Sequence, residues 1–433
     1  MKKKFIKWTA GVTALMMATT GCGAKPEDTG GSRMLTEPAA LQAVGYEDYD
    51  TQWTIREENP VDDSLLEAVN RFSWKTASEI LRAKEGNRNY SPLSLYYALA
   101  MAAQGAKGNT QEEFLSLLGM EDTKKLAEEC GNLFRRLYED NECGKLKMAD
   151  SLWIQNGFPV KKEFLATARA DFYASAFQVD FTDTSAGEAM GAWVAKETEG
   201  LLKPAFNTSP NEVLAIINTL YLNDEWVDRF VESGNTKDSF TTRSGEEITC
   251  EYMNGEYFSQ VYYQGEEYEG TRLYLKNSGS MVFMLPKEGQ DVQNLLTEEK
   301  LSEMFGAGEG VYGTVKLSLP KFSFDDSMEL GETVQALGLK DAFETERADF
   351  GGISKEPGIY ISRIKQESHL GINEKGVEAA AYTAIEMEAG AAFDPAAQET
   401  YVLDLNRPFL FGIISDMGVP LFVGVCDRPT AAE

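Results

Sequence analysis

Between residues 377 and 390, two kinds of side chain alternate. One set carries no charge and is mostly small, and the other contains all the glutamates of the stretch. Because successive side chains of a strand point to opposite faces of a sheet, this pattern predicts a strand with one buried and one solvated face. The flanking Gly376 and Gly390 are typical of a loop, and the many alanines also favour a helix. We interpret the stretch as a segment able to enter a sheet from a loop, with an ordinary helix or edge strand as the alternative.

The rest of the chain alternates between helical and strand patterns. Helical spacing of apolar residues predicts an amphipathic helix over 64–81 and an alanine-rich apolar helix over 95–104. The near-continuous apolar run 213–222 predicts a strand that is buried on both faces. Further strands are predicted at 149–155, 171–180, 406–414 and 420–425, and several strands separated by glycine-containing turns predict an antiparallel sheet over 239–285. The pattern as a whole indicates an α+β fold.

Five segments in the order of the chain resemble segments of the serpin family. They are NYSPLS (89–94) with GAKGNT (105–110), INTLYL (217–222) with Trp226, MVFMLP (281–286), LPKF (319–322), and EKGVEAAA (374–381) followed by RPFLF and PLFVGVC. The resemblance implies a serpin fold, a single large domain over 63–430 with three β-sheets and about nine helices. It also implies an exposed reactive-centre loop at about 374–397.

The same resemblance implies that the chain is a serine protease inhibitor and not an enzyme. In this mechanism the loop serves as an irreversible suicide substrate, and after cleavage its hinge inserts as a new strand into the central sheet. The inserted form is the more stable one, so the native fold is held kinetically.

The residues that match the family's hinge and sheet-opening motifs carry the predicted roles. A charge at an inward hinge position such as Thr383 would lie unpaired in the core, at a cost of several kcal/mol. Many serpins have Thr or Ser where Val377 stands, Ala where Tyr382 stands and His where Gln366 stands. The predicted hinge comprises Glu374, Gly376, Val377, Glu378, Ala379, Ala380, Ala381 and Thr383, and the predicted shutter and breach residues are Ser91, Ser94, Asn218 and Trp226.

The resemblance also implies a position for the reactive bond. It lies about fourteen residues beyond the hinge glycine in typical serpins, which gives Gly390–Ala391 here, with Ala389, Ala392 and Phe393 as alternatives. No Lys or Arg occurs from 377 to 406, so a trypsin-like protease should not be trapped. The small residues favour elastase-like or subtilisin-like targets, and Phe393 would allow a chymotrypsin-like one.

The charge of the chain excludes several kinds of partner. The 433 residues contain 41 Lys and Arg against 69 Asp and Glu, a net charge of −28. Such a chain repels nucleic acid and anionic lipid headgroups. Acids also outnumber bases over 111–148, where some serpins bind glycosaminoglycans, so no glycosaminoglycan partner is predicted. We expect a monomer.

The pattern of residues 1–22 predicts an export signal. Lysines at 2–4 precede a short apolar run, and the stretch ends Thr19-Thr20-Gly21-Cys22. This end resembles a bacterial lipoprotein cleavage box, in which Cys22 would be lipidated, although Thr19 replaces the usual Leu. We therefore predict a lipid-anchored protein at the bacterial cell surface, or a secreted one if ordinary signal cleavage occurs. Residues 23–62 are predicted to form a flexible acidic linker.

The sequence offers little for catalysis or for metal binding. His369 is the only histidine, so a Ser-His-Asp triad would have to use it, and a position on the core or sheet face is favoured instead. The spacing of Cys130, Cys143, Cys250 and Cys426 fits no zinc pattern. No cofactor or metal is predicted. The alternative function is a non-inhibitory serpin that acts as a cell-surface binding protein.

Overall fold

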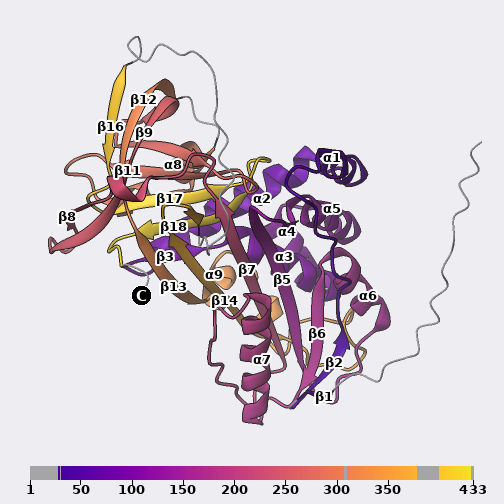
Figure 1. The fold of residues 1–433 in the computed structure, drawn as a ribbon. Helices are drawn as coiled ribbons and strands as arrows, with labels where there is room; N and C mark the ends of the chain where they lie inside the picture. Colours follow the sequence, from indigo (N-terminus) through magenta and orange to yellow (C-terminus); the bar gives the residue numbers. More distant parts are fainter. Residues whose placement is uncertain (1–27, 30, 307–309, 378–398, 431–433) are drawn as a thin grey trace, which may run out of the picture.

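The computed structural model describes residues 28–29, 31–306, 310–377 and 399–430 (Figure 1). Nine α-helices occur within these ranges. They are α1 (Tyr49–Glu58), α2 (Asp63–Arg82), α3 (Pro92–Gly105), α4 (Gly108–Leu118), α5 (Thr123–Leu137), α6 (Lys162–Asp171), α7 (Thr184–Glu197), α8 (Glu298–Phe305) and α9 (Gly331–Ala336).

The first sheet has the strand order β1-β2-β6-β5-β7-β15-β14-β13, and β4 pairs with β5. Its long central strands β5, β7 and β14 each contain twelve residues. The bounds are β1 (Asp28–Thr29), β2 (Ser32–Thr36), β4 (Glu139–Asp140), β5 (Gly144–Gln155), β6 (Ala174–Val179), β7 (Leu214–Glu225), β13 (Phe322–Glu329), β14 (Ile361–Ile372) and β15 (Gly376–Val377).

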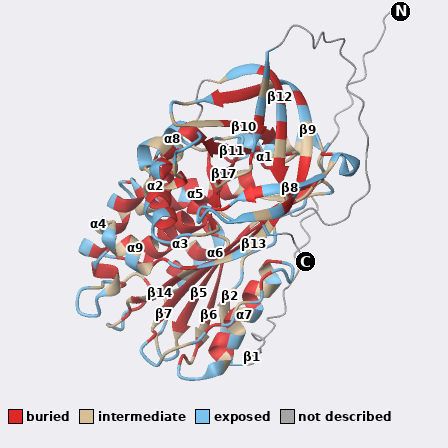
Figure 2. Cartoon of the chain, turned by 90° about the vertical axis from the view of Figure 1, so that its left-hand side faces the viewer, coloured by how far each residue is buried: buried red, intermediate tan, exposed pale blue. Residues whose placement is uncertain are grey.

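Strand β7 is covered on both faces, as its apolar run predicts. Leu214 and Ile216 pack into the large core cluster with α3, while the alternate residues Ala215 and Ile217 pack into a smaller cluster that includes Trp193 of α7. Figure 2 shows α7 on one side of this sheet and most of the helices on the other. The sheet is therefore the middle layer of the molecule.

The second sheet has the order β16-β12-β9-β10-β11-β17-β18-β3, and β8 pairs with β9. Strand β9 contains 18 residues and pairs in turn with β8, β12 and β10. Through these pairings, two of the three sheets that the resemblance predicts form one continuous sheet in this structure. The bounds are β3 (Arg88–Tyr90), β8 (Thr236–Thr241), β9 (Glu247–Gln264), β10 (Tyr268–Tyr274), β11 (Ser280–Pro286), β12 (Val311–Pro320), β16 (Thr400–Asp404), β17 (Phe409–Ile414) and β18 (Pro420–Cys426).

The prediction of a flexible linker over 23–62 is wrong for the part of it that the structure describes. Strand β2 pairs antiparallel with β6 at the edge of the first sheet, and Met34 and Leu35 pack against the two core clusters. Asp48 is the N-cap of helix α1, and its side chain accepts a hydrogen bond from the Thr51 N–H at 3.2 Å. The physical reason is that β6 supplies a free strand edge that this segment completes.

The remaining N-terminal predictions concern residues 1–22, which lie outside the described residues. None of the helices in the described part of the chain is long and apolar enough to cross a membrane. The four cysteines from 130 to 426 are free, and Cys130, Cys250 and Cys426 are buried. Cys130, Cys250 and Cys426 therefore act as small buried apolar residues.

Replacing Met34 by Ser tests whether β2 belongs to the folded domain. Met34 is half-buried against the smaller core cluster, so we expect Met34→Ser to lower the free energy of unfolding by about 1 kcal/mol. The matched control is Arg33→Ser, which makes the same replacement at the exposed neighbouring position. Urea denaturation followed by tryptophan fluorescence measures both variants, and equal stabilities would contradict the assignment.

Candidate functional site: the hinge and the strand gap

The strands β7 and β14 lie side by side along only part of their length. They pair in parallel from Leu214–Ile361 to Thr219–Glu367, and no register pair joins them beyond that point in the described residues. At the far end of the gap, β15 lies between them: Val377 pairs with Ile372 of β14, and both residues of β15 pair with β7. The hinge residues Gly376 and Val377 therefore occupy the mouth of a gap in the central sheet, antiparallel to both neighbours.

Gly376 must be glycine at this place. A Cβ atom there would lie 1.9 Å from the backbone carbonyl oxygen of Asp224 in β7, which no side chain can tolerate. The next residue, Val377, is 1% exposed and belongs to the main core. This is the inward orientation that the alternating pattern predicts for Val377.

The turn that leads into the hinge is held by Trp226 and Phe230. The Trp226 N–H donates to the Lys375 carbonyl oxygen at 2.8 Å, and its indole Nε1 donates to the Asn373 carbonyl oxygen at 2.9 Å. The Phe230 N–H donates to the Glu374 carbonyl oxygen at 3.0 Å. Trp226 is fully buried, so the predicted breach residue fixes the backbone directly before the hinge.

The carboxylate of Glu374 completes this anchor. It lies 2.5 Å from Lys321 Nζ and 2.5 Å from Asn235 Nδ2. Partial burial raises the pKa of Glu374, but the bonds from Lys321 and Asn235 outweigh it and hold the pKa below its ordinary value. The side chain is therefore charged at neutral pH and ties the hinge to the loops around β13 and β8.

At the closed end of the gap, the sheet is tied to the helix beneath it. The Ser91 N–H donates to Gln366 Oε1 at 2.8 Å, and Gln366 Nε2 donates back to the Ser91 carbonyl oxygen at 2.9 Å. Ser91 is also the N-cap of α3, because its hydroxyl accepts from the Ser94 N–H at 3.3 Å. Gln366 thus supplies both a donor and an acceptor at the position where many serpins have His.

The same register row contains a buried carboxylate that the sequence analysis missed. Asn218 pairs with Gln366 of β14 on one side and with Asp150 of β5 on the other, and Asn218 Nδ2 donates to Asp150 Oδ1 at 2.7 Å. Burial raises the pKa of Asp150 to about 7, and the hydrogen bond from Asn218 only partly opposes this shift. An acid directly before the buried stretch Ser151–Ile154 was the one signal that could have identified it.

Another buried acid lies beside the hinge. Burial raises the pKa of Asp224 to about 6, against the hydrogen bonds from Ser278 and Asn277 that stabilise the charged form. The Ser278 N–H and the Asn277 N–H lie 2.7 and 3.0 Å from Asp224 Oδ2. Since the backbone of Asp224 pairs with Val377, this network positions the strand edge that receives the hinge.

Comparison with known proteins decides the family. A family model described as serpin (serine protease inhibitor) matches residues 67–429. An uncharacterized serpin-like protein of Thermococcus kodakarensis is 31% identical over 392 residues, which cover 86% of this chain and 87% of that protein. The chain belongs to the serpin family.

Solved serpin structures agree with the fold. Native tengpin, a thermophilic serpin, superposes with a TM-score of 0.75 at 25% identity, covering 92% of this chain and all of tengpin. Serpin48 of the insect Tenebrio molitor gives a TM-score of 0.76 at 27% identity, covering 85% and 99% of the two chains. The predicted serpin fold is thus confirmed, and membership supports protease inhibition as the general activity in place of catalysis.

Several predicted site residues lie outside the described residues of this serpin. They are the later hinge positions Glu378, Ala379, Ala380, Ala381 and Thr383, the reactive-bond candidates Ala389, Gly390, Ala391, Ala392 and Phe393, and the lipidation site Cys22. Their assignments stay predictions. The structure places the described hinge residues at one end of the gap, with Trp226, and it places Ser91, Ser94 and Asn218 at the other.

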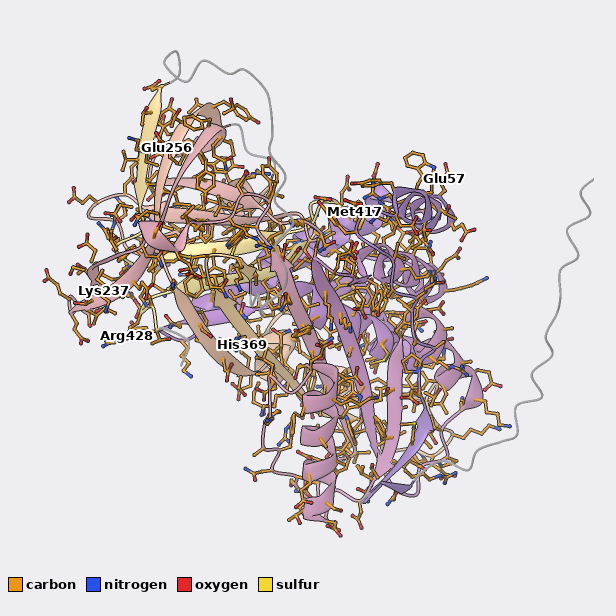
Figure 3. All side chains as sticks on the ribbon, viewed as in Figure 1. Glu57, Lys237, Glu256, His369, Met417 and Arg428 are labelled. Atoms are coloured by element: carbon orange, nitrogen blue, oxygen red, sulfur yellow. The ribbon has the colours of Figure 1, made fainter. Side chains whose placement is uncertain are left out.

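His369 lies beside an aspartate and a serine, as the histidine of a catalytic triad does, but the aspartate is not buried. Its Nδ1 lies 2.5 Å from Asp325 Oδ1, and its Nε2 lies 3.4 Å from Ser323 Oγ. The Asp325 side chain is 67% exposed, whereas the carboxylate of a working triad is buried and fixes the imidazole. All three residues lie on the neighbouring strands β13 and β14, where Figure 3 labels His369. We therefore interpret the group as a polar contact on the sheet face.

Replacing Gly376 by Ala tests the close approach of the hinge to β7. Because the added Cβ would overlap the Asp224 carbonyl oxygen, we expect Gly376→Ala to displace β15 from the gap. Hydrogen exchange of the amides over 220–226 and at Val377 should then be at least about tenfold faster. The control is Gly45→Ala, where a Cβ would meet nothing within 4 Å. Unchanged exchange in the hinge variant would show that the hinge does not need this contact.

Replacing Asp150 by Asn tests the buried acid. The pKa of Asp150 is raised in the folded state, so its contribution to stability is present below the unfolded pKa near 3.8 and is lost as the pH rises through about 7. We therefore expect Asp150→Asn to raise the free energy of unfolding at pH 8, by roughly 4 kcal/mol at most. The gain should shrink steadily as the pH is lowered to 5.

The control for this test is Asp228→Asn, which removes a carboxylate from an exposed position. Urea unfolding at pH 5, 6, 7 and 8 measures the wild type and both variants. A difference between wild type and Asp150→Asn that is the same at every pH would rule out titration of Asp150 over this range.

Proposed function

We propose that this serpin is an inhibitory one, which traps serine proteases by cleavage of its loop and insertion of the hinge into the first sheet. The observation that carries the proposal is the position of β15, whose Gly376 and Val377 already pair with β7 and β14. The hinge that would lead the insertion therefore lies at the start of the path it would follow.

The strand geometry supports insertion on energetic grounds. Separating β7 from β14 breaks one parallel ladder, which runs from Leu214–Ile361 to Thr219–Glu367. An inserted strand that continues β15 would form two antiparallel ladders in its place. Each backbone hydrogen bond contributes about 1 kcal/mol net, and antiparallel pairing is the slightly stronger kind. The exchange therefore favours the inserted state once the gap opens.

The residues after Val377 are suited to that path. The inward positions Ala379, Ala381 and Thr383 are small and uncharged, while the glutamates fall on the outward positions. A non-inhibitory serpin used as a surface binding protein would be expected to carry charges or Pro at the inward positions. The composition of the loop supports elastase-like or subtilisin-like proteases as targets, with cleavage near Gly390–Ala391.

We also propose that the protein acts outside the cell. The lysines at 2–4, the apolar run after them and Cys22 at the end of the stretch support export and lipid anchoring at a bacterial surface. An inhibitor anchored in this way would meet host or competitor proteases. Metabolic labelling with a radioactive fatty acid, compared between wild type and Cys22→Ser, tests the anchor.

Mixing the full-length protein with pancreatic elastase tests the inhibitory function. We expect a complex that survives SDS, with a mass near the sum of the two proteins, and a released C-terminal peptide that mass spectrometry assigns to a cut near Gly390. Thr383→Glu should abolish the complex and leave a cleaved chain, because a carboxylate at an inward position opposes insertion.

The matched control for Thr383→Glu is Tyr382→Glu, which introduces the same charge at the neighbouring outward position. This variant should keep the complex. If elastase, subtilisin and chymotrypsin all cut the wild-type loop without forming a complex, the protein is a substrate only and the non-inhibitory function takes precedence.

A further inference from the structure

The N-terminal segment builds a pocket that the family match does not account for. A cavity of about 360 Å³ lies between α1, the chain before it and the end of α5. Its lining includes Leu41, Val44 and Ile55, all of which precede the matched range 67–429. Figure 1 shows α1 lying over α5, and the two helices are in contact. The volume is within the range of small-molecule sites in proteins.

Three guanidinium groups line this pocket, and none of them has an acidic partner. They belong to Arg56, Arg135 and Arg136, and no carboxylate in the described part of the chain lies within 4 Å of any of them. In a chain with a net charge of −28, three neighbouring unpaired cations are unusual. Such groups are the ones that bind carboxylates and phosphates in a bidentate way.

The three arginines are not equally available. Arg135 is engaged by neutral groups, because its guanidinium donates to Asn59 Oδ1, to Asn132 Oδ1 at 2.7 Å and to Tyr173 Oη at 3.3 Å. Arg136 is half-buried, and its guanidinium has no hydrogen-bond partner among the described residues. Burial lowers the pKa of Arg136, and the charge of Arg56 lowers it further. A bound anion would therefore offset the repulsion between the charges of Arg136 and Arg56.

The acids of the pocket do not neutralise this pair. Asp140 is held by Lys147 at 2.9 Å, and Glu58 lies at the exposed end of α1. Burial raises the pKa of Glu139 to about 7, helped by Asp224 and opposed by Arg56, so this side chain is partly protonated at neutral pH and could donate a hydrogen bond. The pocket thus combines cations, an apolar wall and one weak acid.

We propose that this pocket binds a small organic anion, a carboxylate or phosphate monoester whose charged group contacts Arg136 and Arg56 and whose compact apolar part packs against Leu41, Val44 and Ile55. The proposal does not depend on protease inhibition. It makes the segment 41–59 part of a ligand site, although the sequence alone indicated only a linker.

Isothermal titration calorimetry on the full-length protein tests the site with phenyl phosphate as the probe. We expect saturable binding by one molecule, weaker binding of inorganic phosphate because it lacks the apolar group, and no binding of benzyl alcohol because it lacks the charge. Arg136→Gln and Arg56→Gln should each weaken the binding of phenyl phosphate at least tenfold, as expected for loss of a charge-assisted contact.

The matched control is Lys124→Gln, which removes one positive charge from the exposed surface of the same helix, outside the pocket. It should change the affinity less than twofold. The proposal is overturned if phenyl phosphate shows no saturation up to about 10 mM in the wild type, or if Lys124→Gln weakens binding as much as Arg136→Gln. The proposal is also overturned if the protein binds heparin but not phenyl phosphate, and if Lys124→Gln and Arg136→Gln weaken heparin binding equally. That result would show that anions bind the outer surface of α5 and not the pocket. Thermal unfolding of each variant checks that the fold is intact.

Discussion

The incomplete pairing of β7 with β14 is the constraint on which the rest of the structure depends. The two strands are joined up to Thr219–Glu367 and separated beyond it, with β15 inserted at the far end. Each end of this gap has its own anchor. Gln366 ties the closed end to α3 through Ser91, and Trp226 with Lys321 ties the open end to the hinge. Movement of the hinge along the gap therefore requires both anchors to change.

The strands of the fold were predictable because their signal is local. The apolar run 213–222 alone indicates a strand that is covered on both faces, and β7 over Leu214–Glu225 is such a strand. The inward orientation of Val377 was predictable for the same reason, since alternation of small and acidic residues needs no knowledge of the partner strand. The roles of Ser91, Asn218 and Trp226 came from resemblance and not from any local pattern.

What could not be predicted depends on partners far away in the sequence. Asp150 and Asn218 are 68 residues apart, and Ser91 and Gln366 are 275 apart, so neither pair leaves a trace in local spacing. The N-terminal strand β2 contains only two apolar residues, Met34 and Leu35, and it is ordered because β6 offers an open edge. A short segment of this kind looks like a linker until its neighbour is known.

Buried polar atoms without hydrogen-bond partners at the closed end of the gap lower the stability of the native state. Asp150 Oδ2, Asn218 Oδ1, Thr219 Oγ1 and Ser94 Oγ are buried and have no hydrogen-bond partner among the described protein atoms. An unsatisfied buried polar atom costs about 1–3 kcal/mol, and a few such atoms represent a large part of the stability of a typical domain. Asn218 and Thr219 lie on the edge of β7 that pairs with β14. We infer that separating β7 from β14 costs less free energy than breaking the same number of hydrogen bonds between strands whose buried polar atoms all have partners.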